Sequence, residues 1–175
     1  KHRDAWSRWI FTFGDERCVP PDSDQSNYRM AKEALFDKVP IPPENILRIR
    51  GEADPAVAAQ EYENALRARV KGDGYYRHDL LLLGMGDDGH TASLFPGTEA
   101  LGVTDRWVVS NFVPKFNTHR ITFPYPLLNA ARHVCFLVNS KGKDAVLKEV
   151  FSGQSNYPCA AVRPTQGNLT WLLGA

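Results

Sequence analysis

The sequence predicts an α/β fold, a three-layer sandwich in which helices cover both faces of a mostly parallel, twisted central sheet. Segments with strand composition alternate with segments of helical periodicity along the chain, which is typical of parallel sheets. Residues 79–83 add an unbroken apolar run after one aspartate, which is typical of a strand buried on both faces. The length of 175 residues fits one domain, so we expect a single domain over residues 1–175.

The first third of the chain predicts a strand, a loop, a helix and a second strand. Residues 9–13 (WIFTF) are β-branched or aromatic and favour a strand, which Gly14 ends. Residues 14–24 hold two prolines and several acids, so we expect a loop there. Ser26 is placed to cap a helix that runs to residue 39, where a group of prolines stops it. Residues 46–49 (ILRI) then favour a short strand.

The remaining elements continue this alternation. Asp54 as N-cap and Pro55 at the first helical position predict a helix that runs to residue 70. We expect a glycine-rich turn and a short helix after the strand at residues 79–83. Further strands are expected at residues 106–113, 119–123, 133–138 and 169–173, with a helix at residues 141–151.

Composition and charge exclude several classes of function. The chain has 21 basic and 20 acidic residues and no basic run, so we expect no nucleic-acid partner and no membrane partner. The N-terminal residues lack the apolar core of a signal peptide. Cys18, Cys135 and Cys159 are widely spaced, which argues against a disulfide framework and a thiolate metal site. We expect a cytoplasmic protein; its oligomeric state stays open, with a monomer favoured.

Residues 84–89 (GMGDDG) match the pattern G-x-G-x-x-G directly after the expected buried strand. One interpretation is a dinucleotide-binding turn. Two features oppose it. The carboxylates of Asp87 and Asp88 would repel a pyrophosphate, and Asp105, the candidate for the ribose contact, precedes the next strand instead of ending it. We therefore expect no binding of NAD or NADP.

His90 follows this turn and is the main candidate for chemistry. Strand ends in open α/β sheets face the ligand crevice, and the glycines allow the backbone to approach a substrate. An imidazole titrates near neutrality and can take a proton from water, and the start of a helix would favour its neutral form. Asp88 is close enough along the chain to influence the tautomer of His90. The alternative is that His90 only caps a helix or packs on the surface.

Three blocks of sequence together form a recognisable family signature. The longest and most specific is residues 83–97 (LGMGDDGHTASLFPG). A second consists of residues 14–17 (GDER), 19–20 (VP) and 26–28 (SNY), and a third is residues 120–122 (RIT). In these blocks the sequence resembles the 6-phosphogluconolactonase family; they keep the family's order and extend over nearly the whole chain.

The resemblance implies a fold like that of the sugar-phosphate isomerases and deaminases. It implies hydrolysis of 6-phosphoglucono-δ-lactone to 6-phosphogluconate in the oxidative pentose phosphate pathway, with a phosphorylated sugar lactone as partner and no metal or organic cofactor. The family's catalytic histidine falls on His90, and its acidic and basic groups near the first strand fall on Asp15 and Arg17. Its contacts to the substrate phosphate fall on Lys115 and Arg120.

For the reaction we expect His90 to deprotonate a water that attacks the lactone carbonyl, and then to return the proton to the ring oxygen. Gly86, Asp88 and Gly89 belong to the expected substrate-binding turn, whose backbone N–H groups, like Arg17, are placed to stabilise an oxyanion. A phosphate bound at a distance would hold the carbonyl beside His90.

Each of the other candidates also has a purely structural interpretation. Asp15 can orient the loop after the first strand, and Arg17 can pair with nearby acids in a solvated network that contributes little stability. Arg120 can be a charge on an edge strand, and Lys115 a plain loop lysine.

Family members usually begin with a further strand–loop–helix unit, whose Ser-Gly-Gly segment binds the substrate phosphate. The sequence begins just before the strand expected at residues 9–13 and contains no Ser-Gly-Gly. We therefore expect an N-terminally incomplete domain, whose own activity needs a direct test.

Two other functions remain open. A glucosamine-6-phosphate deaminase or a related isomerase shares the Asp-Gly-His turn, but its turn continues into Asn-Glu-Pro, whereas residues 93–97 (SLFPG) carry no carboxylate. Ring opening with enolisation needs more acid–base groups than lactone hydrolysis, so the missing glutamate favours the lactonase. The second alternative is a non-catalytic module that binds a sugar phosphate.

Overall fold

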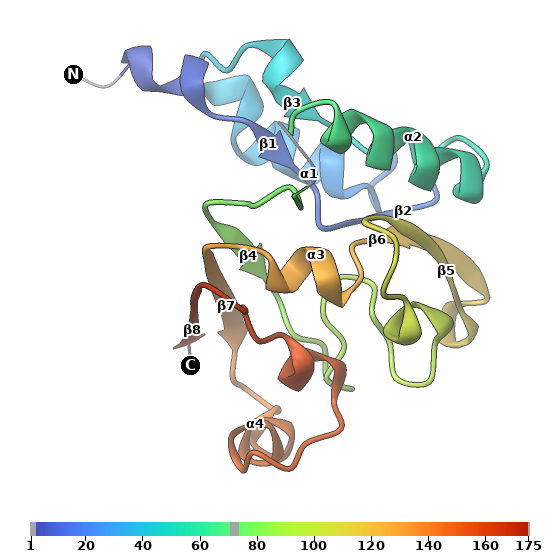
Figure 1. Cartoon of the computed structure of the whole chain (residues 1–175), viewed down its shortest axis with the longest axis vertical. Coiled ribbons are helices and arrows are strands. Elements are labelled where there is room, and N and C mark those ends of the chain that lie inside the picture. Colours follow the sequence, from blue (N-terminus) through green and yellow to red (C-terminus); the bar gives the residue numbers. More distant parts are fainter. Residues whose placement is uncertain (1–2, 71–73, 175) are drawn as a thin grey trace.

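The structure is a computed structural model that describes residues 3–70 and 74–174 (Figure 1). The strands of this part are β1 (Phe11–Thr12), β2 (Asp15–Arg17), β3 (Ile46–Leu47), β4 (Leu81–Leu83), β5 (Val109–Val113), β6 (Thr118–Thr122), β7 (His133–Asn139) and β8 (Asn168–Gly174). The α-helices are α1 (Asn27–Ala34), α2 (Pro55–Arg67), α3 (Tyr125–Asn129) and α4 (Asp144–Phe151). Short 3-10 helices connect several of these elements.

The strands form three sheets. β1 pairs with β3 in parallel, and β4, β7 and β8 form a parallel sheet with β7 in the centre. β2, β6 and β5 form an antiparallel sheet with β6 in the centre. Figure 1 shows α3 between the two larger sheets. Parallel strands and flanking helices confirm the predicted α/β class. The antiparallel sheet is an addition to the prediction, because strand composition does not encode direction.

Side-chain caps begin the two longer predicted helices where expected. The Ser26 hydroxyl accepts a hydrogen bond from the Arg29 amide, and the Asp54 carboxylate accepts from the amides of Ala56 and Val57. The prediction that the first helix reaches residue 39 was wrong. α1 ends at Ala34, and the chain then bends so that Phe36 packs edge-on against Phe11 at 5.3 Å.

The strand predicted at residues 9–13 is also shorter than expected. Only Phe11 and Thr12 pair with β3, whereas Trp9 precedes the strand and stacks on Phe11 with the ring centroids 6.0 Å apart. Aromatic composition therefore predicted the strand but not its length, since ring stacking gives Trp9 a contact that needs no strand pairing.

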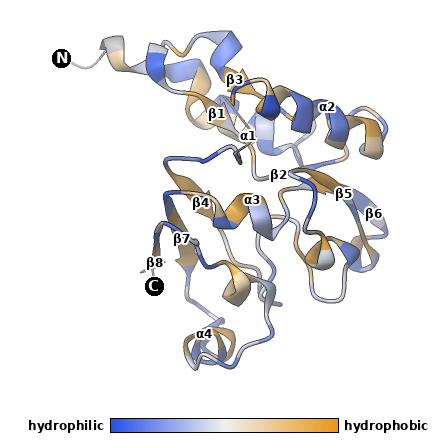
Figure 2. Cartoon of the chain, in the orientation of Figure 1, coloured by the Kyte–Doolittle hydropathy of each residue, from blue (hydrophilic) through white to orange (hydrophobic). Residues whose placement is uncertain are grey.

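The prediction that residues 79–83 are buried on both faces was wrong. Leu81 and Leu83 of β4 join the core, but Leu82 between them is 57% exposed. On the neighbouring strands Leu137 and Leu172 are paired in register and are 49% and 55% exposed. One face of the parallel sheet therefore carries the core, and the other presents these three leucines, which we call the open leucine face. Figure 2 shows how apolar β4 and β7 are.

Candidate active site

A cleft of about 310 Å³ brings together the loop before β2, the start of α1 and the turn after β4. Four of the predicted site residues, Asp15, Arg17, Gly86 and His90, line it. The complete lining is Gly14, Asp15, Arg17, Asn27, Leu82, Leu83, Gly84, Met85, Gly86, His90, Thr91 and Ala92. Segments that are about 70 residues apart in the sequence therefore line one cleft.

The backbone before β2 is held by Tyr62, which is buried on α2. Its hydroxyl accepts a hydrogen bond from the Phe13 amide at 2.7 Å and donates one to the Phe13 carbonyl at 3.2 Å. Burial raises the pKa of Tyr62 far above its ordinary value. The tyrosine therefore stays a neutral hydroxyl that fixes where Gly14 and Asp15 enter the cleft.

Glu16 ties β2 to the start of α1, and the sequence reasoning missed it. Its buried carboxylate accepts hydrogen bonds from the amides of Arg17, Asn27 and Tyr28 and from the Ser26 hydroxyl. These donors include the unpaired amides that every helix leaves at its N-terminus. The acid of the GDER motif that is next to Asp15 is thus structural, and it holds α1 against the cleft.

Arg17 does not form the ion pair that its structural interpretation expected. One of its guanidinium nitrogens donates to the carbonyl of Gln25 instead. This contact leaves the positive charge without a carboxylate partner among the described ion pairs. Arg17 therefore supplies a cation to the wall of the cleft.

The short helix expected at His90 does not form. The chain instead makes consecutive turns, in which the Gly89 amide bonds to the Gly86 carbonyl and the Gly86 amide to the His90 carbonyl. Ala92 then adopts φ +48°, a left-handed conformation that a right-handed helix cannot include. His90 consequently has no helix N-terminus behind it, and the argument that a helix favours its neutral form does not apply.

The glycines of this turn are required by close contacts. A Cβ on Gly86 would lie 2.1 Å from the ring of His90, so only glycine lets the imidazole rest on the backbone. Gly89 has φ +70°, and a Cβ there would meet Tyr157 at 2.5 Å. Gly86 lines the cleft. Gly89 does not line it, but its carbonyl accepts a hydrogen bond from the Cys159 amide, which anchors the turn.

Asp88, His90 and Lys115 form one hydrogen-bonded chain. Asp88 Oδ1 lies 2.5 Å from His90 Nδ1, and Lys115 Nζ donates to Asp88 Oδ2 at 2.8 Å. Partial burial alone would raise the pKa of Asp88, but the bonds from Lys115 and His90 outweigh it and lower the pKa to about 2. The carboxylate is therefore charged at neutral pH and orients the imidazole.

The His90 ring is also held from one side. It stacks on Phe95 with the centroids 4.0 Å apart and the planes 20° from parallel. Since Nδ1 faces Asp88, Nε2 is the ring nitrogen left for a ligand. The geometry gives a fixed imidazole in the wall of a cleft, which is what a general base requires.

Arg120 lies beside the cleft but does not line it in the described structure. It is the cross-strand partner of Arg17 in the pairing of β2 with β6, and its guanidinium lies over the Phe116 ring at 5.3 Å. Its Nε is buried without a hydrogen-bond partner among the described residues. Burial, and then the charge of Arg17, lower the pKa of Arg120. Two guanidinium groups with unused donors therefore lie next to each other.

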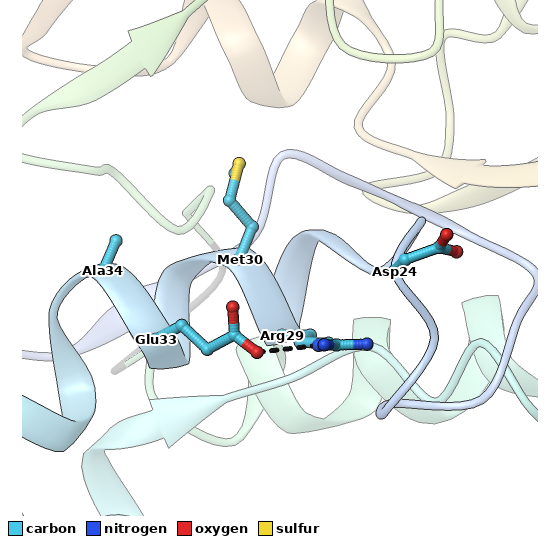
Figure 3. A pocket seen from close by; sticks show the side chains of 5 residues that line it. All are labelled: Asp24, Arg29, Met30, Glu33 and Ala34. Atoms are coloured by element: carbon cyan, nitrogen blue, oxygen red, sulfur yellow. Dashed lines mark hydrogen bonds and ion pairs between the residues drawn. The ribbon is translucent and has the colours of Figure 1, made fainter.

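A second hollow, of about 470 Å³, lies over the outer side of α1 (Figure 3). Asp24, Arg29, Met30, Glu33 and Ala34 line it, and Arg29 is bound to Glu33 at 2.7 Å. None of the predicted site residues contributes to this hollow. It offers one satisfied ion pair and an exposed methionine, and no converging set of polar groups that a ligand site needs.

The described residues lack the features of a metal site and of a membrane span. These residues contain no group of three or more His, Cys, Asp or Glu side chains that could hold a metal ion. Within the same part of the chain, no helix has both the length and the apolar character needed to cross a bilayer.

A model of the family of glucosamine-6-phosphate isomerases and 6-phosphogluconolactonases matches residues 1–171. The chain belongs to this family. Among curated family members, the 6-phosphogluconolactonase of Synechocystis is 45% identical over 175 residues, and that of Homo sapiens is 39% identical over 170 residues. The chloroplastic 6-phosphogluconolactonase 3 of Arabidopsis thaliana is 38% identical over 177 residues.

Solved structures of the family share the fold. The devB protein superposes with a TM-score of 0.88 at 35% identity, and covers 96% of this chain and 72% of its own. The 6-phosphogluconolactonase of Thermotoga maritima superposes with a TM-score of 0.85 at 32% identity, over 97% of this chain and 74% of its own. The resemblance stated from the sequence is therefore confirmed.

The relatives are longer than this chain. The match covers 96% of this chain in both cases, but 71% of the Synechocystis protein and only 54% of the Arabidopsis protein. For the human protein the shares are 95% and 66%.

Proposed function

We propose that this chain hydrolyses 6-phosphoglucono-δ-lactone to 6-phosphogluconate, the activity for which its relatives are named. The observation that carries the proposal is the bond of 2.5 Å between Asp88 and His90 in the wall of a cleft that also contains Asp15 and Arg17. A charged carboxylate on Nδ1 holds the proton there and leaves Nε2 as the basic nitrogen. His90 then takes a proton from water as the water attacks the lactone carbonyl.

The charges that develop in this reaction have partners nearby. The negative Asp88 stabilises the imidazolium that forms when His90 accepts the proton, as in other carboxylate–histidine pairs. Arg17 provides a cation for the oxyanion or for a substrate oxygen. The proton on His90 returns to the ring oxygen as the C–O bond breaks, which opens the lactone and regenerates the base. A positioned base of this kind is typically worth ~10²–10⁴ in rate.

The neighbouring guanidinium groups of Arg17 and Arg120 support binding of the substrate phosphate. Paired guanidinium donors suit phosphate oxygens, and the buried Nε of Arg120 has no other partner among the described residues. Lys115 was predicted to make this contact, but the structure supports another role, since its ammonium is bound to Asp88. We therefore propose that Lys115 holds Asp88 in place and that Arg17 and Arg120 bind the phosphate.

The cleft favours the lactonase over a sugar-phosphate isomerase. The isomerase relay would need a carboxylate in residues 93–97, which contain none; Ser93 in this stretch donates a hydrogen bond from its hydroxyl to Asp15. Lactone hydrolysis needs one positioned base, and His90 in the wall of the cleft is placed to supply it. The predictions of a single domain, a monomer and a cytoplasmic location stay predictions.

The test is a pH-stat assay, because hydrolysis releases one acid per lactone opened. The lactone also hydrolyses without a catalyst, so the rate is measured against a blank. We expect the chain to accelerate hydrolysis and His90→Ala to lose most of the acceleration while keeping its circular dichroism. His119→Ala is the matched control, since His119 lies on the exposed side of β6 and contacts Phe112. Equal rates for His90→Ala and the unchanged chain would refute the assignment.

A further inference from the structure

Ser93 is a buried residue whose polar groups all bind to other elements. It lies three residues after His90 and is 1% exposed. Its hydroxyl donates to Asp15 Oδ2 at 2.7 Å, and its amide donates to the Thr122 hydroxyl at 3.1 Å. Its carbonyl accepts from the Asn111 side chain at 2.9 Å. One small residue thus connects the His90 turn to β2, β6 and β5.

Asp15 is held from two sides by neutral donors. The Ser93 hydroxyl binds Oδ2, and the Asn27 side-chain amide binds Oδ1 at 3.1 Å. Fixing both oxygens sets the plane of the carboxylate. Each oxygen can accept more than one hydrogen bond, so Asp15 keeps acceptor capacity for a ligand hydroxyl in the cleft.

The two halves of the cleft belong to different sheets. Asp15 is on β2 of the antiparallel sheet, and His90 follows β4 of the parallel sheet. The hydrogen bond between Ser93 and Asp15 therefore connects the turn that follows β4 of the parallel sheet to a cleft side chain on β2 of the antiparallel sheet. Small errors in such distances are costly, since a displacement of about 1 Å in a bound substrate can reduce a rate by about 10²-fold.

We propose that Ser93 is a positioning residue for this site. Its hydroxyl sets the place of the Asp15 carboxylate relative to His90, so that a substrate hydroxyl bound by Asp15 presents the carbonyl to the water that His90 activates. This inference rests on the proposed function. Ser93 itself touches no substrate in this scheme and acts only through Asp15.

The test is a double-mutant cycle on kcat/KM with Ser93→Ala, Asp15→Ala and the double variant, because alanine at position 15 leaves no acceptor for the Ser93 hydroxyl. We expect Ser93→Ala to lower kcat/KM by about 10- to 10²-fold. The double variant should match Asp15→Ala within about twofold, because Ser93 has nothing left to position once the carboxylate is gone. Independent losses that multiply in the double variant would overturn the proposal.

Thr98→Val separates positioning from stability. Thr98 belongs to the same buried network, since its hydroxyl binds the Phe95 carbonyl and the Asn111 side chain, but it has no bond to Asp15. Thr98→Val and Ser93→Ala each remove one buried hydroxyl, so we expect both to lower the free energy of unfolding. Only Ser93→Ala should lower kcat/KM. Two outcomes would refute the inference while the proposed function stands. One is an equal loss of kcat/KM in both variants; the other is a Ser93→Ala variant whose kcat/KM equals that of an active unchanged chain.

An inactive unchanged chain would instead count against the proposed function. In that case calorimetry measures the affinity of the unchanged chain, the two single variants and the double variant for 6-phosphogluconate, and these affinities replace kcat/KM in the cycle. The coupling between Ser93 and Asp15 should appear there too, and its absence, or the absence of binding, would remove the inference.

Discussion

Asp88 reaches forward two residues to hold the imidazole of His90, with 2.5 Å between Oδ1 and Nδ1. Its second oxygen is occupied by Lys115, which comes from the 3-10 helix at Pro114–Phe116 between β5 and β6. The carboxylate is therefore fixed by a contact within its own turn and by one from a distant segment. Oδ1 binds the imidazole and Oδ2 binds Lys115, so the orientation of His90 depends on both contacts.

Replacing Asp88 tests this relationship. Asp88→Asn removes the charge that stabilises the imidazolium and lets either end of an amide face Nδ1, so the tautomer is no longer fixed. We expect kcat to fall by about 10²- to 10⁴-fold, the contribution typical of a positioned base. The measurement is the pH-stat rate at saturating lactone.

Asp87→Asn is the matched control for this prediction. The Asp87 side chain is 88% exposed and lies 3.6 Å from Lys143, away from the imidazole. We expect its kcat to stay within about twofold of the unchanged chain. If the Asp88→Asn variant were as active as Asp87→Asn, the Asp88 carboxylate would not be what orients His90.

Replacing Gly89 tests the support behind the turn. Gly89→Ala places a Cβ where Tyr157 already lies and holds alanine at φ +70°. Gly97→Ala imposes nearly the same backbone conformation, φ +73°, but no atom lies within 4 Å of its Cβ. We expect Gly97→Ala to cost about 1–2 kcal/mol of stability from the backbone alone, and Gly89→Ala to cost clearly more. Urea unfolding of the two variants measures this difference, and equal losses would mean that Tyr157 simply moves aside.

The buried His78 should make the free energy of unfolding depend on pH. It is buried between Tyr76 and Phe123, and its Nε2 shares a hydrogen bond with the Thr12 hydroxyl. Burial lowers its pKa to about 4, and the charge of Asp79 opposes this only slightly. The folded chain therefore keeps a neutral imidazole at pH values where the unfolded chain, with a pKa near 6.5, binds a proton.

The sign of the effect follows from this order of pKa values. The contribution of His78 is complete above pH 6.5 and is lost as the pH falls toward 4, by about 3 kcal/mol. His78→Phe cannot titrate, so we expect its free energy of unfolding to fall less than that of the unchanged chain between pH 7.5 and pH 4. Chemical denaturation at several pH values measures both slopes. Parallel slopes would show that His78 is protonated in the folded chain as easily as in the unfolded one.

Local chemistry in the sequence was sufficient for much of the fold. The Ser26 and Asp54 caps were predicted because a side-chain oxygen at a helix start binds amides a few residues away. The cleft at the end of β4 was predicted because glycines and a histidine follow an apolar strand. The exposure of Leu82 was not predictable in this way, since a run of leucines reads the same whether one face of the strand or both are covered.

The parts of the site that the sequence did not reveal depend on contacts between distant segments. Ser93 and Asp15 are 78 residues apart, and nothing near either residue signals their bond. Glu16 looked like one of several loop acids until the fold placed it against the amides of α1. The helix expected at His90 failed for the same reason: the turn is shaped by contacts to Gly84, Phe95 and Tyr157 that local propensity does not contain.

Leu82 belongs both to the wall of the cleft and to the open leucine face. A molecule that covers that face therefore contacts a residue that also lines the cleft. Any free energy of interaction between the two binding events is equal in both directions, because of thermodynamic linkage. Occupancy of the cleft and coverage of the sheet would then report on each other, even if no side chain of either partner met the other.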